Sequence, residues 1–407
     1  MKCRHCNTEL KLQFLDLGNA PPSNAYLKYD DLRKPEITYP LRILTCTNCW
    51  LVQTEDYAEA DTLFNEDYAY LSSTSKGWLR HAADYCTMVT ERLGLTADSF
   101  VVELASNDGY LLKNFVASGV PCLGIEPTKS TAEAAKAIGV PVRQQFFSKY
   151  VGEDMANTGK KADLVLGNNV YAHVPDINDF TQGVAALLKP NGVVTFEFPH
   201  LMQLITQNQF DTVYHEHFSY LSLYTVITMF AAAGLRVFDV EELPTHGGSL
   251  RIYGCLSGAE HIKTNSVEAV LIAEKEAGLQ TEETYKLFQA KANAVKDGFV
   301  RFLLDAKAAG KSVAGYGAAA KGNTLMNYAG IRPDLIPFVC DAADSKIGQY
   351  LPASHIPILP PSTLTERRPD YLVILPWNIA EEVMKQNADL AVQGTKFVTA
   401  VPSLKVF

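Results

Sequence analysis

The chain has 407 residues, of which 47% are hydrophobic and 20% are charged, and its formal net charge is −9 at pH 7. This length suits two or three domains with substantial cores and excludes a mainly disordered chain. The acidic balance gives no support for binding to nucleic acid or to a membrane surface, and no apolar run reaches the roughly 20 residues that cross a bilayer. The N-terminus lacks the apolar stretch of a signal peptide, so we expect a cytoplasmic protein.

Two Cys-x-x-Cys pairs lie near the N-terminus: Cys3, Cys6, Cys46 and Cys49. A tight turn can point both sulfurs of a pair the same way, and two pairs make the closed four-thiolate shell of a structural zinc site. The alternatives are four reduced thiols or a redox pair, although a redox pair needs no second copy. Segments 12–17 and 37–44 look like strands, so we expect a small zinc module over residues 1–70.

Two polar positions of the N-terminal part are candidates for substrate contact. Asn24 follows two prolines, which can fix a loop, and Tyr70 precedes a serine-rich run at 72–75. That run could contact a ligand or simply cap a helix. Linking helices are expected up to about residue 95.

A doubly wound sheet is expected to begin near residue 100. Residues 100–104 are apolar enough for a buried strand, and a small-residue turn and an amphipathic helix follow. The next strand, 122–125, ends in Glu126 and Pro127, where an acid can accept hydrogen bonds from ribose hydroxyls. Ligands of such sheets sit beyond the carboxyl ends of the strands.

The first turn of this sheet favours S-adenosylmethionine over a dinucleotide. It carries two acids and one glycine, and carboxylates would repel a pyrophosphate but suit an ammonium and a sulfonium. The pattern resembles the first motif of class I methyltransferases, with Ala105 where glycine is common; a negative φ there would make the departure mild. A later strand, 162–167, ends in two asparagines, and another is expected at 193–198 after a Lys-Pro-Asn-Gly turn. The residues expected to hold the donor are Glu103, Ala105, Ser106, Asn107, Asp108, Gly109, Glu126, Pro127, Asn168 and Asn169.

The densest cluster of titratable groups is Tyr-His-Glu-His-Phe-Ser-Tyr at 214–220. Such a stretch can supply a general base near pH 7, a group that orients it, and a donor to a developing oxyanion. A metal site built on His-x-His, or ordinary packing, are the alternatives. His173, shortly after the strand at 162–167, is expected to project into the same crevice, either assisting or only lining it.

The last third suggests a second α/β unit. Residues 267–309 read as helices that link the lobes, and residues 311–324 as a strand, a glycine turn and a helix. The turn departs from the dinucleotide fingerprint and adds Lys321, and a lysine beside backbone amides at a helix start suits a diphosphate. We therefore interpret it as a nucleotide-diphosphate handle, with an NAD site closed by Asp341 or a purely structural fold as alternatives. Strands are expected at 336–340 and 371–375.

In this order, the motifs resemble the nucleotide-sugar C-methyltransferases that make branched deoxysugars, typified by the TDP-sugar C-3′-methyltransferase of tetronitrose biosynthesis. Besides the paired cysteines, the likeness rests on five segments: 106–109, 214–217, 246–251, 315–317 and 321–323. It covers essentially the whole chain. It implies an α/β protein with a zinc-binding module at 1–70, a central class I methyltransferase domain with a Rossmann-like fold at 71–240, and a C-terminal Rossmann-like domain at 241–407. That last domain would bind the sugar nucleotide without NAD.

The resemblance also implies a mechanism. Tyr214, Glu216 and His217 correspond to the family's catalytic set, and His173 to a further active-site histidine. His217 would remove the C3 proton of a 4-keto sugar, with its ring held by Glu216. Tyr214, with His173, would donate to the enolate oxygen, and C3 would then attack the donor's methyl group. The residues expected to bind the substrate are Asn24, Tyr70, His246, Arg251, Tyr316, Lys321 and Asn323.

Three other functions compete with this one. They are an O- or N-methyltransferase acting on another metabolite, an NAD-dependent oxidoreductase using the C-terminal lobe, and a non-enzymatic binding module. The expected partner is a nucleotide-diphosphate sugar, by resemblance dTDP-linked, and the expected state is a monomer or a small homo-oligomer.

Overall fold

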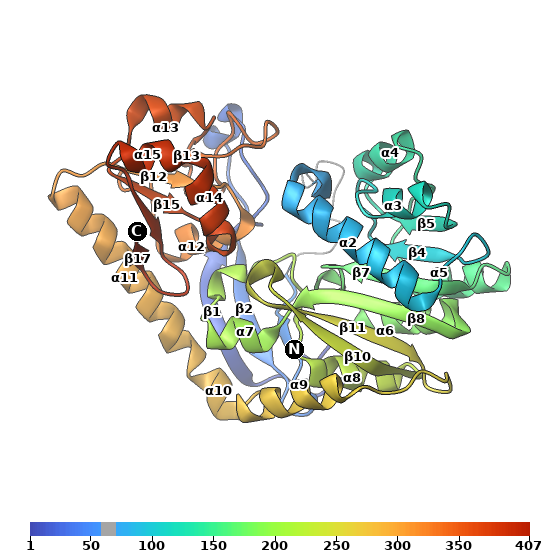
Figure 1. Cartoon of the computed structure of the whole chain (residues 1–407). Coiled ribbons are helices and arrows are strands. Elements are labelled where there is room, and N and C mark those ends of the chain that lie inside the picture. The colour runs from blue at the N-terminus through green and yellow to red at the C-terminus, as the bar shows by residue number, and fades with distance from the viewer. Residues whose placement is uncertain (58–70) are drawn as a thin grey trace.

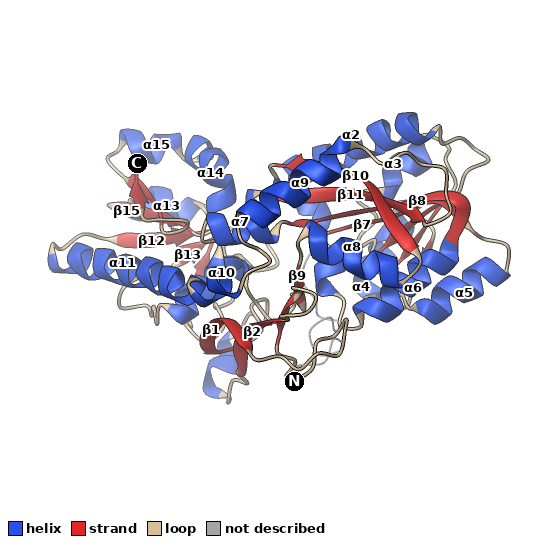
Figure 2. Cartoon of the chain, turned by 90° about the horizontal axis from the view of Figure 1, so that it is seen from below, coloured by secondary structure: helices blue, strands red, loops and turns tan. Residues whose placement is uncertain are grey.

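The computed structural model describes residues 1–57 and 71–407, which form three sheets (Figure 1). Two α/β lobes, central and C-terminal, lie side by side, and strands of the N-terminal module lie between them in both views (Figures 1 and 2). In the described part of the chain, no helix is both long and apolar enough to cross a membrane. The predicted α/β architecture is confirmed.

The N-terminal sheet is antiparallel and has the order β1-β2-β3-β9. Its strands are β1 (Leu12–Ala20), β2 (Tyr39–Thr45), β3 (Val52–Thr54) and β9 (Ser219–Tyr220). Strand β1 turns its apolar side chains inward, and Phe14 stacks on Phe288 of the long helix α11 (Phe288–Ala308) at 4.5 Å between ring centroids. The fourth strand, β9, belongs to a distant part of the chain, so the module is completed by the central lobe.

The central sheet has the order β10-β11-β8-β7-β4-β5-β6. In chain order its strands are β4 (Val101–Leu104), β5 (Cys122–Ile125), β6 (Val142–Arg143), β7 (Ala162–Asn168), β8 (Leu188–Pro199), β10 (Leu235–Leu243) and β11 (Ser249–Leu256). The strands from β6 to β8 are parallel and buried, which explains their nearly continuous apolar sequences. The helices of this lobe are α2 (Lys76–Leu93), α3 (Leu112–Ala117), α4 (Lys129–Ala137), α5 (Lys149–Asn157), α6 (Ile177–Leu187), α7 (Leu201–Thr206) and α8 (Leu223–Ala232).

Two details of the central sheet differ from the sequence expectation. Strand β8 begins at Leu188 rather than at 193, because the Lys-Pro-Asn-Gly segment continues the ladder through a register shift. Strand β11 is inserted antiparallel between β8 and β10, so the sheet extends to Leu256, past the boundary expected near residue 240.

Three helices lead to the C-terminal lobe, in the region where helices were expected: α9 (Asn265–Glu276), α10 (Glu282–Lys286) and α11. The lobe's sheet has the order β14-β13-β12-β15-β16-β17, parallel except for the last strand. Its strands are β12 (Val313–Tyr316), β13 (Val339–Cys340), β14 (Ile358–Leu359), β15 (Tyr371–Ile374), β16 (Lys396–Thr399) and β17 (Lys405–Val406). Its helices are α12 (Ala320–Tyr328), α13 (Ser362–Arg367), α14 (Ala380–Gln386) and α15 (Ala388–Val392).

Candidate active site and zinc centre

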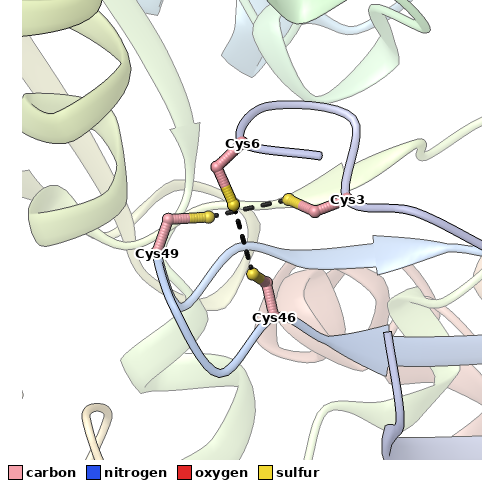
Figure 3. Close-up of side chains that lie close together, drawn as sticks. All are labelled: Cys3, Cys6, Cys46 and Cys49. Carbon is pink, nitrogen blue, oxygen red and sulfur yellow. Dashed lines mark hydrogen bonds between the residues drawn. The ribbon is translucent and has the colours of Figure 1, made fainter. Parts of the chain in front are cut away.

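The four paired cysteines converge on one point (Figure 3). The Sγ atoms of Cys3 and Cys49 are 3.6 Å apart, those of Cys6 and Cys46 are 3.5 Å apart, and all four lie within 4.8 Å of one another. Sulfurs bound at about 2.3 Å around a tetrahedral ion would be separated by roughly 3.8 Å, so the cluster fits zinc and leaves no open position. The Nδ1 atom of His5 contacts the Asn178 amide oxygen instead, at 2.7 Å.

The turn after β4 contains residues with positive φ and packs closely against neighbouring side chains. Ala105 and Asn107 have φ values of 52° and 50°, in the left-handed region that favours glycine. Ala105 therefore does not have the negative φ that would make its departure from glycine mild. At Gly109, a Cβ atom would come within 3.0 Å of Val140, which explains the glycine. The turn is also tied to residues that precede α2, because the amides of Ser72 and Ser73 donate to the side chains of Asn107 and Asp108.

Buried polar atoms around this turn fit S-adenosylmethionine. Several have no hydrogen-bond partner among the described residues: one carboxylate oxygen each of Glu103 and Asp108, the hydroxyl of Ser106, both amide atoms of Asn168 and the amide oxygen of Asn169. Most are acceptors, which suits an ammonium group and ribose hydroxyls. Burial raises the pKa of Glu103 above its ordinary value, and the nearby Glu126 and Asp108 add to the effect. Glu126 accepts from the Asn107 amide at 2.9 Å. Together with Asn107, Asn168 and Asn169, it lines a cavity at this end of the sheet.

The His217 ring is held in a defined tautomer. Its Nδ1 atom lies 3.0 Å from the carbonyl oxygen of Thr212, and since a carbonyl can only accept, Nδ1 carries the proton and Nε2 the lone pair. Burial lowers the pKa of His217 below its ordinary value, and the neighbouring His173 acts in the same direction. The imidazole is therefore neutral near pH 7, the form that a general base requires.

His173 and Tyr214 surround that ring. The ring centroids of His173 and His217 are 4.6 Å apart, and those of Tyr214 and His217 are 4.0 Å apart. The Nδ1 atom of His173 donates to the carbonyl oxygen of Glu216 at 2.7 Å, and burial lowers the pKa of His173 to about 4. A neutral His173 with its proton on Nδ1 has an Nε2 that can only accept. It therefore does not suit the expected role of donor to an enolate, which leaves Tyr214 for that role.

The Glu216 carboxylate does not hold the His217 ring, contrary to expectation. It accepts hydrogen bonds from the Ser23 hydroxyl at 3.2 Å and from the Asn24 amide at 3.2 Å, while Thr212 occupies the Nδ1 position of His217. Burial raises the pKa of Glu216, and these two donors oppose that shift. Glu216 thus connects the segment 214–220 to the loop around Asn24.

One cavity of about 430 Å³ is lined by residues of both lobes. Its central-lobe wall includes the turn after β4 and the two asparagines at the end of β7. It also includes the side chains of His173, Tyr214, Glu216, His217 and His246. The C-terminal lobe contributes the start of α12 with Lys321, together with Lys346 and Asn378. The Lys321 ammonium donates to Asn378 at 2.7 Å and lies 4.8 Å from the Trp377 ring. Lys321 and a helix N-terminus thus face Tyr214, Glu216 and His217 across one cavity.

Sequence comparison covers the same three regions. Residues 3–64 match a zinc binding domain family, residues 78–240 a methyltransferase domain family, and residues 244–402 the family described as C-methyltransferase C-terminal domain. C-methyltransferase NovU of Streptomyces niveus is 35% identical over 405 residues, which span 100% of this chain and 96% of the relative. This chain belongs to the C-methyltransferase family. It is an S-adenosylmethionine-dependent enzyme with a zinc-binding module at its N-terminus.

More distant relatives match a smaller share of this C-methyltransferase. Ubiquinone biosynthesis O-methyltransferase of Bartonella tribocorum is 25% identical over 95 residues, which are 23% of this chain and 38% of the relative. The solved structure of magnesium protoporphyrin IX methyltransferase from Synechocystis, with bound SAH, covers 44% of this chain and 84% of its own, at 14% identity and a TM-score of 0.35.

Three expected substrate residues of the C-methyltransferase lie away from the cavity wall. Arg251 pairs with Glu197 at 2.8 Å and Glu241 at 3.2 Å, because these acids stand opposite it on the two neighbouring strands. Tyr316 packs into the apolar core of the C-terminal sheet. Asn323 is buried and donates to the Ser23 carbonyl oxygen at 2.6 Å. Tyr70 lies outside the described residues.

The His-x-His interpretation as a metal site is wrong. His215 lies 3.3 Å from the carbonyl oxygen of Pro40 and packs against the Tyr39 ring, whereas His217 faces the cavity. His215 therefore packs against the N-terminal module, whereas Tyr214, Glu216 and His217 line the cavity. Among residues 1–57 and 71–407, the only group of three or more ligand side chains that could hold a metal is the cysteine cluster.

His246 reaches the cavity through a strained loop. Its φ is 55°, and its Nε2 accepts from the Asn169 amide at 2.9 Å. Burial lowers its pKa to about 4, and Lys321 acts in the same direction. The Trp78 ring stands edge-on to it at 5.3 Å.

Sequence reasoning missed several residues of the cavity wall. They are the aromatic and apolar side chains of Trp78, Tyr110, Phe146, Phe147 and Phe180. Phe146 is 46% exposed, and the Phe146–Phe147 pair lies shortly after β6, at the ligand-binding edge of the sheet. Two consecutive phenylalanines in a stretch for which no element was expected were the available signal.

Proposed function

We propose that this C-methyltransferase acts on a nucleotide-linked 4-keto deoxysugar and places the methyl group on C3. The observation that carries the proposal is the shared cavity, in which a neutral histidine, a phenol and a partly buried lysine from the other lobe face the turn after β4. Methyl transfer to carbon needs a base more than transfer to oxygen does, because a carbon atom is a poor nucleophile until a neighbouring carbonyl lets it form an enolate.

The base in this proposal is Nε2 of His217, which takes the C3 proton while the electron pair moves into the enolate. Thr212 accepts from Nδ1 and keeps the ring in the tautomer that leaves Nε2 available. Tyr214, 4.0 Å away between ring centroids, is the donor to the enolate oxygen. When bound, S-adenosylmethionine supplies an electrophilic methyl carbon. C3 takes this carbon, and S-adenosylhomocysteine leaves.

The C-terminal lobe holds the diphosphate in this proposal. Lys321 lies in the first turn of α12, where backbone amides and the helix dipole favour an anion. Burial lowers the pKa of Lys321, and the nearby Asp211 carboxylate opposes this shift. A bound diphosphate would stabilise the charged form of Lys321, which burial disfavours. The site would therefore bind a charged sugar nucleotide more tightly than a free sugar.

The decisive experiment incubates the enzyme with S-adenosylmethionine and a panel of 4-keto-6-deoxy sugar nucleotides. Mass spectrometry should find a product heavier by one methylene, together with S-adenosylhomocysteine. Without the donor, the enzyme in D2O should exchange the C3 hydrogen of the same sugar. An O- or N-methyltransferase would methylate without this exchange, and failure of both reactions across the panel would refute the proposal.

An NAD-dependent activity of the C-terminal lobe competes with this proposal. Asp341, the acid that would meet an NAD ribose, accepts from the amides of Ala318 and Ala343 at 2.7 and 2.8 Å. The turn at Gly317 packs so closely that a Cβ there would lie 2.5 Å from the Pro376 ring. The two amides occupy the Asp341 carboxylate, which counts against an NAD ribose at that position. NAD should leave the melting temperature unchanged, whereas S-adenosylhomocysteine or dTDP should raise it.

A further inference from the structure

Strand β3 of the N-terminal module pairs with the segment that follows His217. Val52 stands opposite Tyr220 and Gln53 opposite Ser219 in an antiparallel ladder. The ladder continues as the Thr54 amide donates to the carbonyl oxygen of Phe218 at 3.1 Å. The backbone on the C-terminal side of the proposed base is therefore part of the N-terminal sheet.

Thr54 adds a side-chain contact to this ladder. Its hydroxyl donates to the carbonyl oxygen of His217, and the side chain is 2% exposed. On the other side, the His217 amide donates to the carbonyl of Tyr214 at 3.0 Å and the ring donates to Thr212. Thr54 is thus the contact from outside the segment that fixes the peptide group of His217.

The zinc cluster lies directly before this strand. Cys46 and Cys49 form the turn that joins β2 to β3, and the Gln53 amide donates to the Cys3 sulfur at 3.3 Å. The Gln53 oxygen in turn accepts from the Arg4 amide at 2.9 Å. A metal bound by the four sulfurs would therefore fix the start of β3 and, through it, the position of Thr54.

From these contacts we infer that Thr54 is a positioning residue for His217, and that the zinc-held hairpin serves catalysis by aligning the base. The inference rests on the proposed role of His217. A shift of about 1 Å in a reacting group can cost roughly a hundredfold in rate. Loss of one hydroxyl beside the base should therefore affect the proton-transfer step much more than ligand binding.

The test compares Thr54→Val, which keeps the shape but removes the donor, with Thr54→Ser, which keeps the donor. Thr45→Val is the matched control, because Thr45 is a buried threonine of the same hairpin whose hydroxyl has no partner among the described residues. For each variant we would measure kcat, KM for the sugar nucleotide, the C3 exchange rate in D2O, zinc content, and the Kd of S-adenosylhomocysteine by calorimetry.

Thr54→Val should lower kcat and C3 exchange by roughly ten- to a hundredfold, with KM, Kd and zinc content unchanged. Thr54→Ser should regain most of both rates, and Thr45→Val should match the wild type. Equal rates in Thr54→Val and wild type, or an equal fall in Thr45→Val, would overturn the inference. If Thr54→Val does not fold, Thr54→Ala takes its place under the same criteria. Absence of exchange in the wild type would instead refute the proposed function.

Discussion

His217 and His173 each donate their Nδ1 proton to a main-chain carbonyl oxygen, so both rings present an unprotonated Nε2. Burial lowers the pKa of both. Two neutral histidines with centroids 4.6 Å apart can coexist, whereas two imidazolium ions at that distance would repel each other strongly. At the scale of single residues, the fold thus keeps His217, the proposed base, neutral near pH 7.

Replacement of His217 by asparagine should abolish this base while keeping a polar side chain of moderate size. We expect the C3 exchange rate and kcat to fall by about 10²- to 10⁴-fold, the usual contribution of a general base. The Kd of S-adenosylhomocysteine should stay the same. Tyr214→Phe, which removes only the hydroxyl, should have a smaller effect; retained exchange in His217→Asn would show that another group is the base.

The pH profile follows from the direction of the His217 pKa shift. The base is active when neutral, and burial lowers its pKa from the ordinary 6.5, so the acid limb of kcat/KM should lie below pH 6.5. From pH 6.5 to 8 the base should remain fully active. Glu216 is the second candidate source of an acid limb, because burial raises its pKa. The variant Glu216→Gln removes this carboxyl group and so distinguishes the two sources. A limb that moves in Glu216→Gln, or one centred above pH 7, would contradict this assignment.

Helix α12 serves two purposes with side chains two residues apart. Lys321 faces the cavity, while the Asn323 amide donates to the Ser23 carbonyl, and the Ser23 hydroxyl reaches Glu216. The helix that we propose as the diphosphate site is therefore connected through one loop residue to the catalytic segment. At the scale of elements, the loop around Ser23 links the two lobes.

Asn323→Ala should loosen this loop. We expect a loss of about 1–3 kcal/mol in the free energy of unfolding, because a buried acceptor loses its donor, and a several-fold fall in kcat from a less ordered Glu216. Chemical denaturation and steady-state kinetics would measure the two effects. Asn327→Ala, on the same helix and with an amide oxygen that has no partner among the described residues, is the control and should change kcat little. Equal kinetics in the two variants would contradict the link.

The N-terminal module contacts both of the lobes whose residues line the cavity. Its third strand pairs with β9, its Leu27 exchanges backbone hydrogen bonds with Tyr350 at 2.8 and 3.0 Å, and its Tyr26 hydroxyl donates to Ala318 at 2.5 Å. The module therefore joins the two walls that the ligands would share. Its integrity should matter for both stability and turnover.

Removal of zinc tests this role of the module. Four thiolates freed of the metal lose the bonds that close a loop of about forty residues, so a chelator should lower the melting temperature and the kcat together. Added zinc should restore both, and elemental analysis should find one ion per chain. A chelated enzyme with unchanged stability and turnover would show that the four cysteines carry no structural ion.

Sequence patterns predicted most of the elements and part of the site. Strands β4, β5 and β7 were placed within two residues of their ends, because buried parallel strands leave continuous apolar runs. The cysteine spacing gave the metal cluster. The same patterns misplaced Arg251, whose role depends on acids that stand opposite it on two other strands and are remote in sequence.

By itself, the sequence determined the three-part order of this C-methyltransferase and its cysteine cluster. It also predicted the turn and the segment that we propose for donor binding and catalysis, because each of these features depends on residue types at short spacings. Only the tertiary structure decided which side chains of that segment face the cavity, which nitrogen of His217 carries the proton, and what Glu216 contacts. The last two depend on contacts with Thr212 and Ser23. Ser23 is more than 150 positions away from His217, and no local pattern encodes a contact at such a separation.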